Sequence, residues 1–201
     1  MPTTGSPITD KQEYDLNNMN VAAQNIQLGT YIKNSYLVWD DLFFPLTTAK
    51  QGQTDKPPFD PAENAYMYPA GDTTHIMYIA AQFPHSMQKG SEIHPHVHWK
   101  QTTGGSPVFK MNYRWFNLGG AISASAIYTM DTRGFTWTSG SIHNLNYNPA
   151  GLSGSSITTP SSMMLIALYR DDSAYPGSVP TYQFDIHIRK DSNGSYEEFT
   201  K

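Results

Sequence analysis

The chain has 201 residues, a formal net charge of −4 and no cysteine. The length suits one domain with a sizeable core, and the missing cysteine excludes disulfides and thiolate chemistry. Charged residues make up 15% of the chain, below the roughly 25% that is usual for soluble domains. Because the chain has no Lys/Arg run and no apolar stretch near the roughly 20 residues of a membrane span, we expect neither nucleic-acid nor membrane binding.

Residues 1–35 are polar and rich in Asn and Gln, with only a weak helical rhythm. Two interpretations are open for this segment: an extended arm that packs against a neighbour, and a disordered tail. The first ten residues do not have the pattern of a signal peptide. The predicted division is an extended N-terminal arm over residues 1–35 and a β domain over residues 36–201.

The β domain contains seven or eight segments with the composition of strands, separated by Gly, Pro and Asn turn signals. These segments are residues 36–46, 75–83, 91–100, 108–116, 121–131, 135–138, 161–172 and 182–191. The proline-rich residues 47–71 are expected to form a long surface loop. Because strands do not alternate with helices, the predicted fold class is all-β: an antiparallel β-sandwich of the jelly-roll type.

The stretch SEIHPHVHWK, residues 91–100, carries histidines at every second position. On a strand, this spacing puts His94, His96 and His98 on one face and an apolar row that ends in Trp99 on the other. Pro95 has no backbone N–H to donate, which predicts an edge strand or a bulge. The histidine face is therefore the outer one, and its role depends on whether it binds an ion or contacts another subunit.

A metal site is one interpretation of the row. Alternate residues on a strand lie about 7 Å apart, so two of the three imidazoles could share an ion if their rings converge. A cupin-type enzyme uses such a His-x-His pair with a carboxylate a few residues later, but residues 99–102 contain none. Asp185 or His187 could meet the row from the last strand. We predict no metal and no other cofactor, with His94, His96 and His98 as the candidate ligands should an ion bind.

The favoured interpretation of the row is an assembly interface formed by His94, His96 and His98. Neutral imidazole both donates and accepts hydrogen bonds, and it is desolvated at lower cost than Lys or Glu. Such a side chain suits a surface that becomes buried when subunits associate.

Catalytic residues are not predicted anywhere in the chain. Asp40 and Asp41 are adjacent on a strand and face opposite ways, so they cannot converge on one bond and are expected to serve a turn or cap. His85 is expected to be solvated in a turn. Neither a nucleophile elbow nor a phosphate-binding loop is present, so the protein is expected not to be an enzyme.

Three stretches together resemble a family of small virion proteins of tailed bacteriophages. They are VWDDLFFPL (38–46), QFPHSMQKGSEIHPHVHWK (82–100) and FDIHIRKDSNGSYEEFTK (184–201). The specific part of the pattern is HPHVHW, and the resemblance spans most of residues 36–201. The sequence departs from the family at residues 188–190, where an aromatic residue and an acid are more usual. The family has no established catalytic residues.

The resemblance implies a non-enzymatic virion structural protein. The expected role is a capsid cement or decoration protein, made in the host cytoplasm, that stabilises the head from the capsid exterior. Its expected partners are itself, as a homotrimer, and the major capsid protein that it bridges. One alternative is a tail, baseplate, receptor-binding or glycan-binding component of the virion, and another is a cupin-like metalloprotein.

Overall fold

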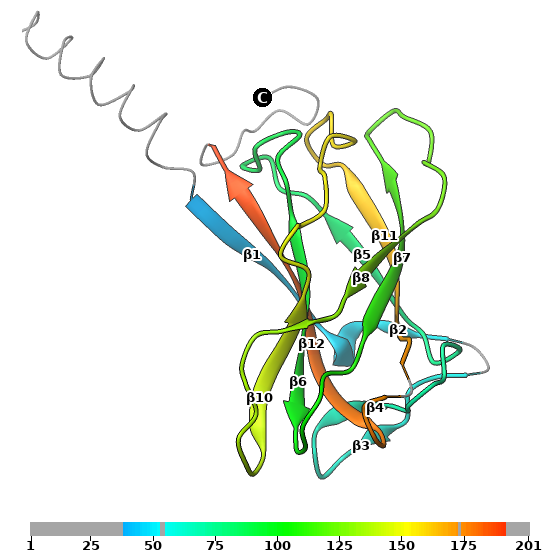
Figure 1. The fold of residues 1–201 in the computed structure, drawn as a ribbon. Coiled ribbons are helices and arrows are strands. Elements are labelled where there is room, and N and C mark those ends of the chain that lie inside the picture. Colours follow the sequence, from blue (N-terminus) through cyan, green and yellow to red (C-terminus); the bar gives the residue numbers. More distant parts are fainter. Residues whose placement is uncertain (1–37, 53–54, 173, 192–201) are drawn as a thin grey trace, which may run out of the picture. The chain divides into compact units, whose positions relative to one another are not determined.

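The computed structural model describes residues 38–52, 55–172 and 174–191. These residues form twelve strands and one short 3-10 helix, η1 (Leu46–Thr48), arranged in two antiparallel sheets (Figure 1). None of the helical segments in this part of the chain has the length and apolar character needed to cross a bilayer. The predicted arm over residues 1–35 lies outside the described residues.

The first sheet has seven strands in the order β3-β4-β12-β6-β10-β9, with β1 also paired to β12. Its strands are β1 (Val38–Pro45), β3 (Phe59–Asp60), β4 (Ala65–Tyr68), β6 (His94–Gln101), β9 (Thr132–Arg133), β10 (Ile142–Tyr147) and β12 (Val179–Lys190). The second sheet has five strands in the order β2-β5-β11-β7-β8. Its strands are β2 (Lys50–Gln51), β5 (Met77–Gln82), β7 (Phe109–Phe116), β8 (Ala126–Met130) and β11 (Met163–Arg170).

The strand order is that of a jelly roll. β1 and β4 pair with opposite halves of β12 and together occupy one position in the first sheet. With the two-residue strands set aside, the first sheet then reads β1/β4-β12-β6-β10 and the second reads β5-β11-β7-β8. With β1 and β4 counted as one strand, the chain changes sheet at every step except from β7 to β8. Its first strand lies beside its last, as in two wound Greek keys. The predicted antiparallel jelly-roll sandwich is therefore confirmed.

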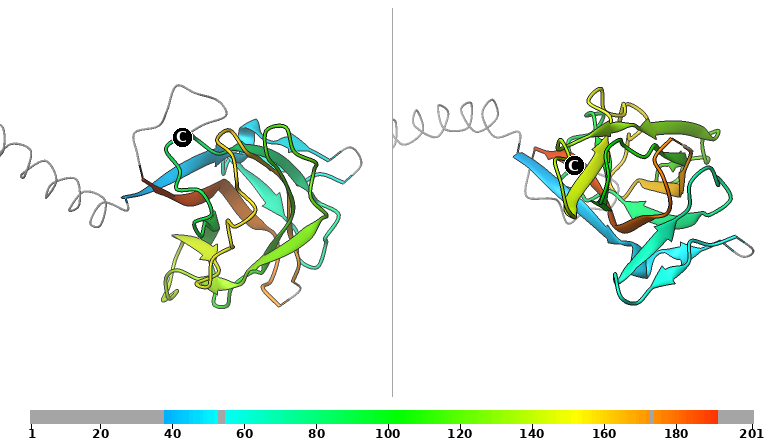
Figure 2. Two further views of the ribbon diagram at one scale, coloured as in Figure 1. Left: turned by 90° about the horizontal axis from the view of Figure 1, so that it is seen from above. Right: turned by 60° about the horizontal axis from the view of Figure 1, so that its bottom comes forward.

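The core lies between the two sheets, which face each other in the view from above (Figure 2). Strand alternation puts Phe109, Met111 and Trp115 of β7 inside, with Tyr113 half-buried. From β6, Val97 and Trp99 are fully buried. The apolar row of the histidine strand is thus a core row, and its histidines lie on the outer face of the first sheet.

One strand of the first sheet was predicted in the wrong place. The expected strand over residues 135–138 does not form, and the strand that does form nearby is β10, which begins at Ile142. The inward residues of β10 are Asn144 and Asn146, both fully buried. An inward row of amides does not have the apolar alternation by which strands are recognised, so the sequence pattern missed it.

The expected surface loop over residues 47–71 is only partly a loop. It contains β2, β3 and β4, and the Tyr68 side chain of β4 is fully buried. β4 pairs with the first residues of β12, Val179 to Thr181. The prolines at 57, 58 and 61 flank the short strand β3, and the polar residues around them concealed these strands.

Pro95 does not mark an edge strand, because β6 lies inside the first sheet between β12 and β10. Its last pair with β10 joins His96 to Tyr147. Pro95 is therefore one residue past the end of that ladder, where β10 no longer requires a backbone N–H from β6.

Candidate functional site

The candidate site lies on the outer face of the first sheet, where β10, β6, β12 and β1 run side by side. The strand register aligns their outward side chains in cross-strand rows. His96 lies opposite Asp185 of β12, and His94 lies opposite His187. His187 in turn lies opposite Asp41 of β1. Titratable side chains from three strands are therefore neighbours, although they are far apart in sequence.

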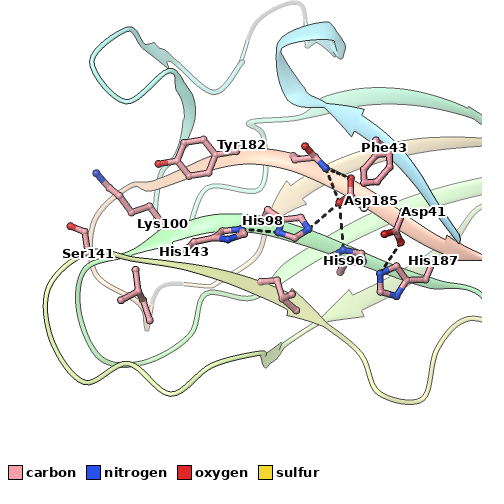
Figure 3. Close-up of a pocket in the computed structure, with 13 residues that line it drawn as sticks. Asp41, Phe43, His96, His98, Lys100, Ser141, His143, Tyr182, Asp185 and His187 are labelled. Atoms are coloured by element: carbon pink, nitrogen blue, oxygen red, sulfur yellow. Dashed lines mark hydrogen bonds and ion pairs between the residues drawn. The ribbon is translucent and has the colours of Figure 1, made fainter. Parts of the chain in front are cut away.

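The Asp185 carboxylate is the centre of the site. It is 2% exposed although it lies on an outer face, because the neighbouring side chains cover it. Its Oδ2 is 2.9 Å from Nε2 of His98 and 3.5 Å from Nε2 of His96. Figure 3 shows both rings pointing at this carboxylate. The Gln183 amide donates to both carboxylate oxygens, at 2.7 and 2.8 Å.

These partners keep Asp185 ionised. Burial by itself raises the pKa of the carboxyl, but hydrogen bonds from His96, His98 and Gln183 lower it, and the result is a pKa well below the usual range for aspartate. A buried negative charge requires compensation nearby. In the described part of the chain, the ion-pair partners of Asp185 are the two histidines.

Two further histidines flank this centre. Nδ1 of His98 is 2.8 Å from Nε2 of His143 on β10, and the two rings are stacked. On the other side, the His187 ring lies 4.4 Å from the His96 ring, and its Nε2 is 2.8 Å from Oδ1 of Asp41. Burial lowers the pKa of His143 and of His187, with a smaller contribution from the neighbouring histidine in each case. Burial thus favours the neutral imidazole in both rings, and for His187 the nearby Asp41 opposes this effect.

The cluster forms part of an open groove of about 650 Å³, which we call the histidine groove. Phe43, Leu145 and Tyr182 supply apolar surface beside the polar centre, and Lys100 lies toward one end (Figure 3). The complete lining is Asp41, Phe43, His96, His98, Lys100, Ser141, Ile142, His143, Leu145, Tyr182, Gln183, Asp185 and His187. A second hollow of about 600 Å³ surrounds Trp39, His94 and Tyr147 and shares His96, Leu145 and His187 with the first.

The three predicted histidines do not act as one set. His96 and His98 converge on Asp185, whereas His94 lies 3.7 Å from Glu92 and packs against the Trp39 ring in a T-shaped arrangement. His96 is only 5% exposed, and His94 and His98 are half-buried. The third member of the converging group is therefore Asp185, a residue that the sequence offered only as one that could meet the row from the last strand.

Two groups of site residues were missed for identifiable reasons. His143 and Leu145 belong to β10, the strand that its buried amides concealed. Simple alternation would place Tyr182 in the inward row of Phe184, but the β12 register is interrupted between Thr181 and Gln183. The bulge buries Thr181 and lets Tyr182 line the groove.

Asp40 and Asp41 face opposite ways, as predicted, but they serve no turn or cap because both lie within β1. Asp41 pairs with His187 in the histidine groove, and Asp40 pairs with Lys190 at 3.0 Å. His85 lies in a turn, as predicted, but it is not solvated. It is half-buried, and its Nε2 is 2.7 Å from Oγ of Ser161.

Comparison with known proteins gives structural likenesses only. No protein-family model and no curated protein matches the sequence. A chain from the structure of infectious bursal disease virus, Gx strain, is similar with a TM-score of 0.40 and 10% identity over 79% of this chain. This chain spans only 34% of that viral chain.

Two smaller structures are also similar to this chain. The CBM36-1 domain of a multidomain xylanase, from the hindgut metagenome of Trinervitermes trinervoides, has a TM-score of 0.31 and 8% identity, with 73% of this chain and 96% of that one covered. The Eiger TNF structure from S. frugiperda has a TM-score of 0.25 and 9% identity, with 82% and 98% covered. None of these likenesses assigns a function to this chain.

Proposed function

We propose that this protein is a non-enzymatic structural protein of a tailed-bacteriophage virion, a cement or decoration protein that bridges major capsid proteins on the capsid exterior. The HPHVHW pattern and its two flanking stretches support the phage assignment. The jelly roll supports a structural role, because this fold is one that capsid domains use. The more specific support comes from the surfaces that the described residues expose.

The observation that carries the proposal is the edge strand β1. In the described part of the chain, its eight residues pair with β12 alone. Its outward side chains include Trp39, 42% exposed, and Phe43, 61% exposed. Monomeric proteins usually protect such an edge with short strands, Lys or Pro. A long edge with exposed aromatic rings is instead suited to association with another chain.

The charges of β1 do not protect this edge, because they are already paired within the domain. Asp41 bonds His187 and Asp40 bonds Lys190. Trp39 also packs under the guanidinium of Arg189, 4.9 Å from its ring centre, which holds the indole in a fixed position. A partner would therefore meet a prearranged aromatic surface, and prearrangement lowers the entropic cost of binding.

The second sheet offers another apolar surface. Tyr78, Ile127 and Leu165 are exposed on its outer face, beside a shallow hollow of about 720 Å³. This face and the β1 edge belong to different sheets, so the domain can contact two partners at once. We assign the β1 edge, with His94 and His98 nearby, to a sister subunit of a homotrimer, and the face of the second sheet to the major capsid protein.

Copy number in purified virions tests the proposal. Quantitative mass spectrometry against the major capsid protein is expected to find this chain in hundreds of copies per particle. A few copies per particle would place it in the tail or baseplate and overturn the cement role. Electron microscopy of particles labelled with an antibody to this chain should show the label over the head, and label confined to the tail would count equally against the proposal.

A further inference from the structure

We propose that His96, His98 and Asp185 form a binding site for one divalent transition-metal ion, of which Zn²⁺ and Fe²⁺ are the best matched. Two imidazole nitrogens and one carboxylate oxygen are a donor set that both ions use in proteins. The proposal goes beyond the cement role, although the two share a surface, because Asp41 and Phe43 of β1 line the same groove as the three ligands. Metal content and virion copy number test the two proposals separately.

The distances from Asp185 to the two histidines are already close to those of a bound state. Metal–ligand bonds of about 2.0–2.2 Å in a tetrahedron put neighbouring donor atoms about 3.3 Å apart. Here Oδ2 of Asp185 lies 2.9 Å from Nε2 of His98 and 3.5 Å from Nε2 of His96. The potential ligand atoms of the three residues all lie within 4.8 Å of one another. A change of a few tenths of an ångström in each of the two distances from Oδ2 of Asp185 to a histidine Nε2 would give this spacing.

The orientation of His96 favours a positive charge beside Asp185. Nδ1 of His96 is 3.4 Å from the backbone carbonyl of His94, which can only accept a hydrogen bond, so this nitrogen carries the proton. In the neutral ring, Nε2 then points a lone pair toward the Asp185 carboxylate. That arrangement is unfavourable unless a proton or a metal ion lies between the two groups.

The surrounding residues can fix the ligands in place. The Gln183 amide holds both oxygens of Asp185, and His98 uses its second nitrogen to bond His143. When Nε2 of His98 binds a metal, Nδ1 carries the proton and His143 is the acceptor. Such outer partners orient metal-binding imidazoles in characterised sites.

The site is also accessible. All three residues line the histidine groove, which is open to solvent, and the picture shows the carboxylate and both rings on that side (Figure 3). Three protein donors leave a fourth position free toward the groove. Water, or a donor group of a bound partner, would occupy it.

Metal content of the purified full-length chain, prepared without a polyhistidine tag, tests the proposal. After EDTA treatment and dialysis, the protein is incubated with ZnSO₄ or, under anaerobic conditions, with Fe²⁺, desalted and assayed by elemental analysis. We expect about one ion per chain, and Co²⁺ should give the intense visible absorption of a four-coordinate site. Saturation with metal at about 100 times the Kd should raise the Tm by ~5–10 °C.

Matched variants locate the ion. His96→Gln, His98→Gln and Asp185→Asn should each weaken binding at least 100-fold, and His143→Gln should weaken it by roughly 10–100-fold. The controls are His94→Gln and His75→Gln, which should bind as the wild type does, because His94 faces Glu92 and His75 pairs with Asp72 elsewhere.

Two results would overturn the proposal: less than a tenth of an ion retained by the wild type with no shift in Tm, or undiminished binding by His98→Gln. The first result would mean that a protonated imidazole, and not a metal ion, supplies the positive charge beside Asp185. Because Asp185 and His96 are buried, their variants are first compared with the wild type by circular dichroism. If they do not fold, the half-buried His98 variant and the wild-type Tm shift decide the outcome.

Discussion

The indole N–H of Trp99 donates a hydrogen bond to the side-chain oxygen of Asn146 at 2.9 Å, and both residues are fully buried. Trp99 lies on β6 and Asn146 on β10, so the bond joins the histidine strand to its neighbour through the core. The Asn146 amide nitrogen also donates to Ser106, Pro107 and Met130. The buried Asn146 amide therefore forms hydrogen bonds with polar groups from several segments of the chain.

Replacing Asn146 with Leu should destabilise the domain by about 3–5 kcal/mol, because each buried polar group left without a partner costs roughly 1–3 kcal/mol. Urea unfolding followed by tryptophan fluorescence measures the change. Asn112→Ala is the control, since Asn112 is exposed on the outer face of β7 and should cost less than about 0.5 kcal/mol. Equal midpoints for the two variants would contradict a structural role for the amide.

Arg170 is a second buried polar centre, on β11. Its guanidinium is fully buried and bonds Asp172, the carbonyl of Tyr68 at 3.0 Å and the carbonyl of Gly177 at 2.6 Å. Arg170→Met would leave the largely buried Asp172 carboxylate without its cation, at an expected cost of about 3–5 kcal/mol. Arg114→Met, on the exposed face of β7, serves as the control and should be nearly neutral in the same urea titration.

The ionisation of Asp172 should make the stability of the domain depend on pH. Burial alone raises its pKa, but hydrogen bonds from Arg170 and from the backbone N–H groups of Val108 and Tyr175 lower the pKa below the usual value for aspartate. A lowered pKa in the folded state means that the stabilisation is complete above the unfolded-state value of about 3.9 and is lost as the pH falls through the folded-state value.

Asp172→Asn should therefore be less stable than the wild type at pH 6, and the difference should shrink as the pH falls below about 4. Free energies of unfolding at pH 6, 4 and 3 are compared for the two proteins. A difference that stays constant over this range would show that the carboxyl is not ionised preferentially in the folded state.

Gly154 contacts the chain just before the histidine strand. A Cβ built at this position would overlap the backbone oxygen of Ser91, which cannot move aside like a flexible side chain. This contact lies next to the bridge between Ile93 and Leu152, where both backbone amides are bonded. Gly154→Ala should cost about 1–3 kcal/mol through overpacking.

Gly104→Ala is the matched control for Gly154, because nothing lies within 4 Å of a Cβ added at residue 104. It should change the midpoint of thermal unfolding by no more than about 2 °C. If Gly154→Ala were as stable as this control, the close approach of the two segments would not be required for the fold.

The parts of the fold that the sequence predicted follow from burial on one face of a strand. Val97 and Trp99 alternate with histidines, and Phe109 alternates with polar residues, so the two faces could be distinguished without a structure. The prediction failed where the core itself is polar. Asn144 and Asn146 face inward, and only the hydrogen bonds that the fold provides make their burial favourable.

Strand alternation also explains why only part of the candidate site was predicted. Alternation placed His96 and His98 on one face, but it could not determine which residue of another strand would lie opposite. The pairing of His96 with Asp185 depends on the register between β6 and β12, and a shift by one residue would bring a core residue to that position. The bulge after Thr181, which sends Tyr182 into the groove, is likewise a property of the paired strands.

The aromatic edge of β1 gives the most direct test of assembly. Phe43→Lys places a charge on a ring position that is 61% exposed, so the fold should keep its stability while an interface built on this edge is lost. Exposed aromatic residues that become buried in an interface often contribute about 2 kcal/mol or more, and the proposed trimer should dissociate at least 10-fold more readily. Analytical ultracentrifugation over a range of concentrations measures this equilibrium.

Phe135→Lys is the matched control for Phe43, because Phe135 is equally exposed, at 60%, but lies in the turn before β10 rather than on β1. It should associate as the wild type does. The two variants therefore separate loss of the β1 interface from a general effect of added positive charge. If both variants form trimers of wild-type stability, the sister subunit does not bind along β1, and the exposed face of the second sheet becomes the surface to test next.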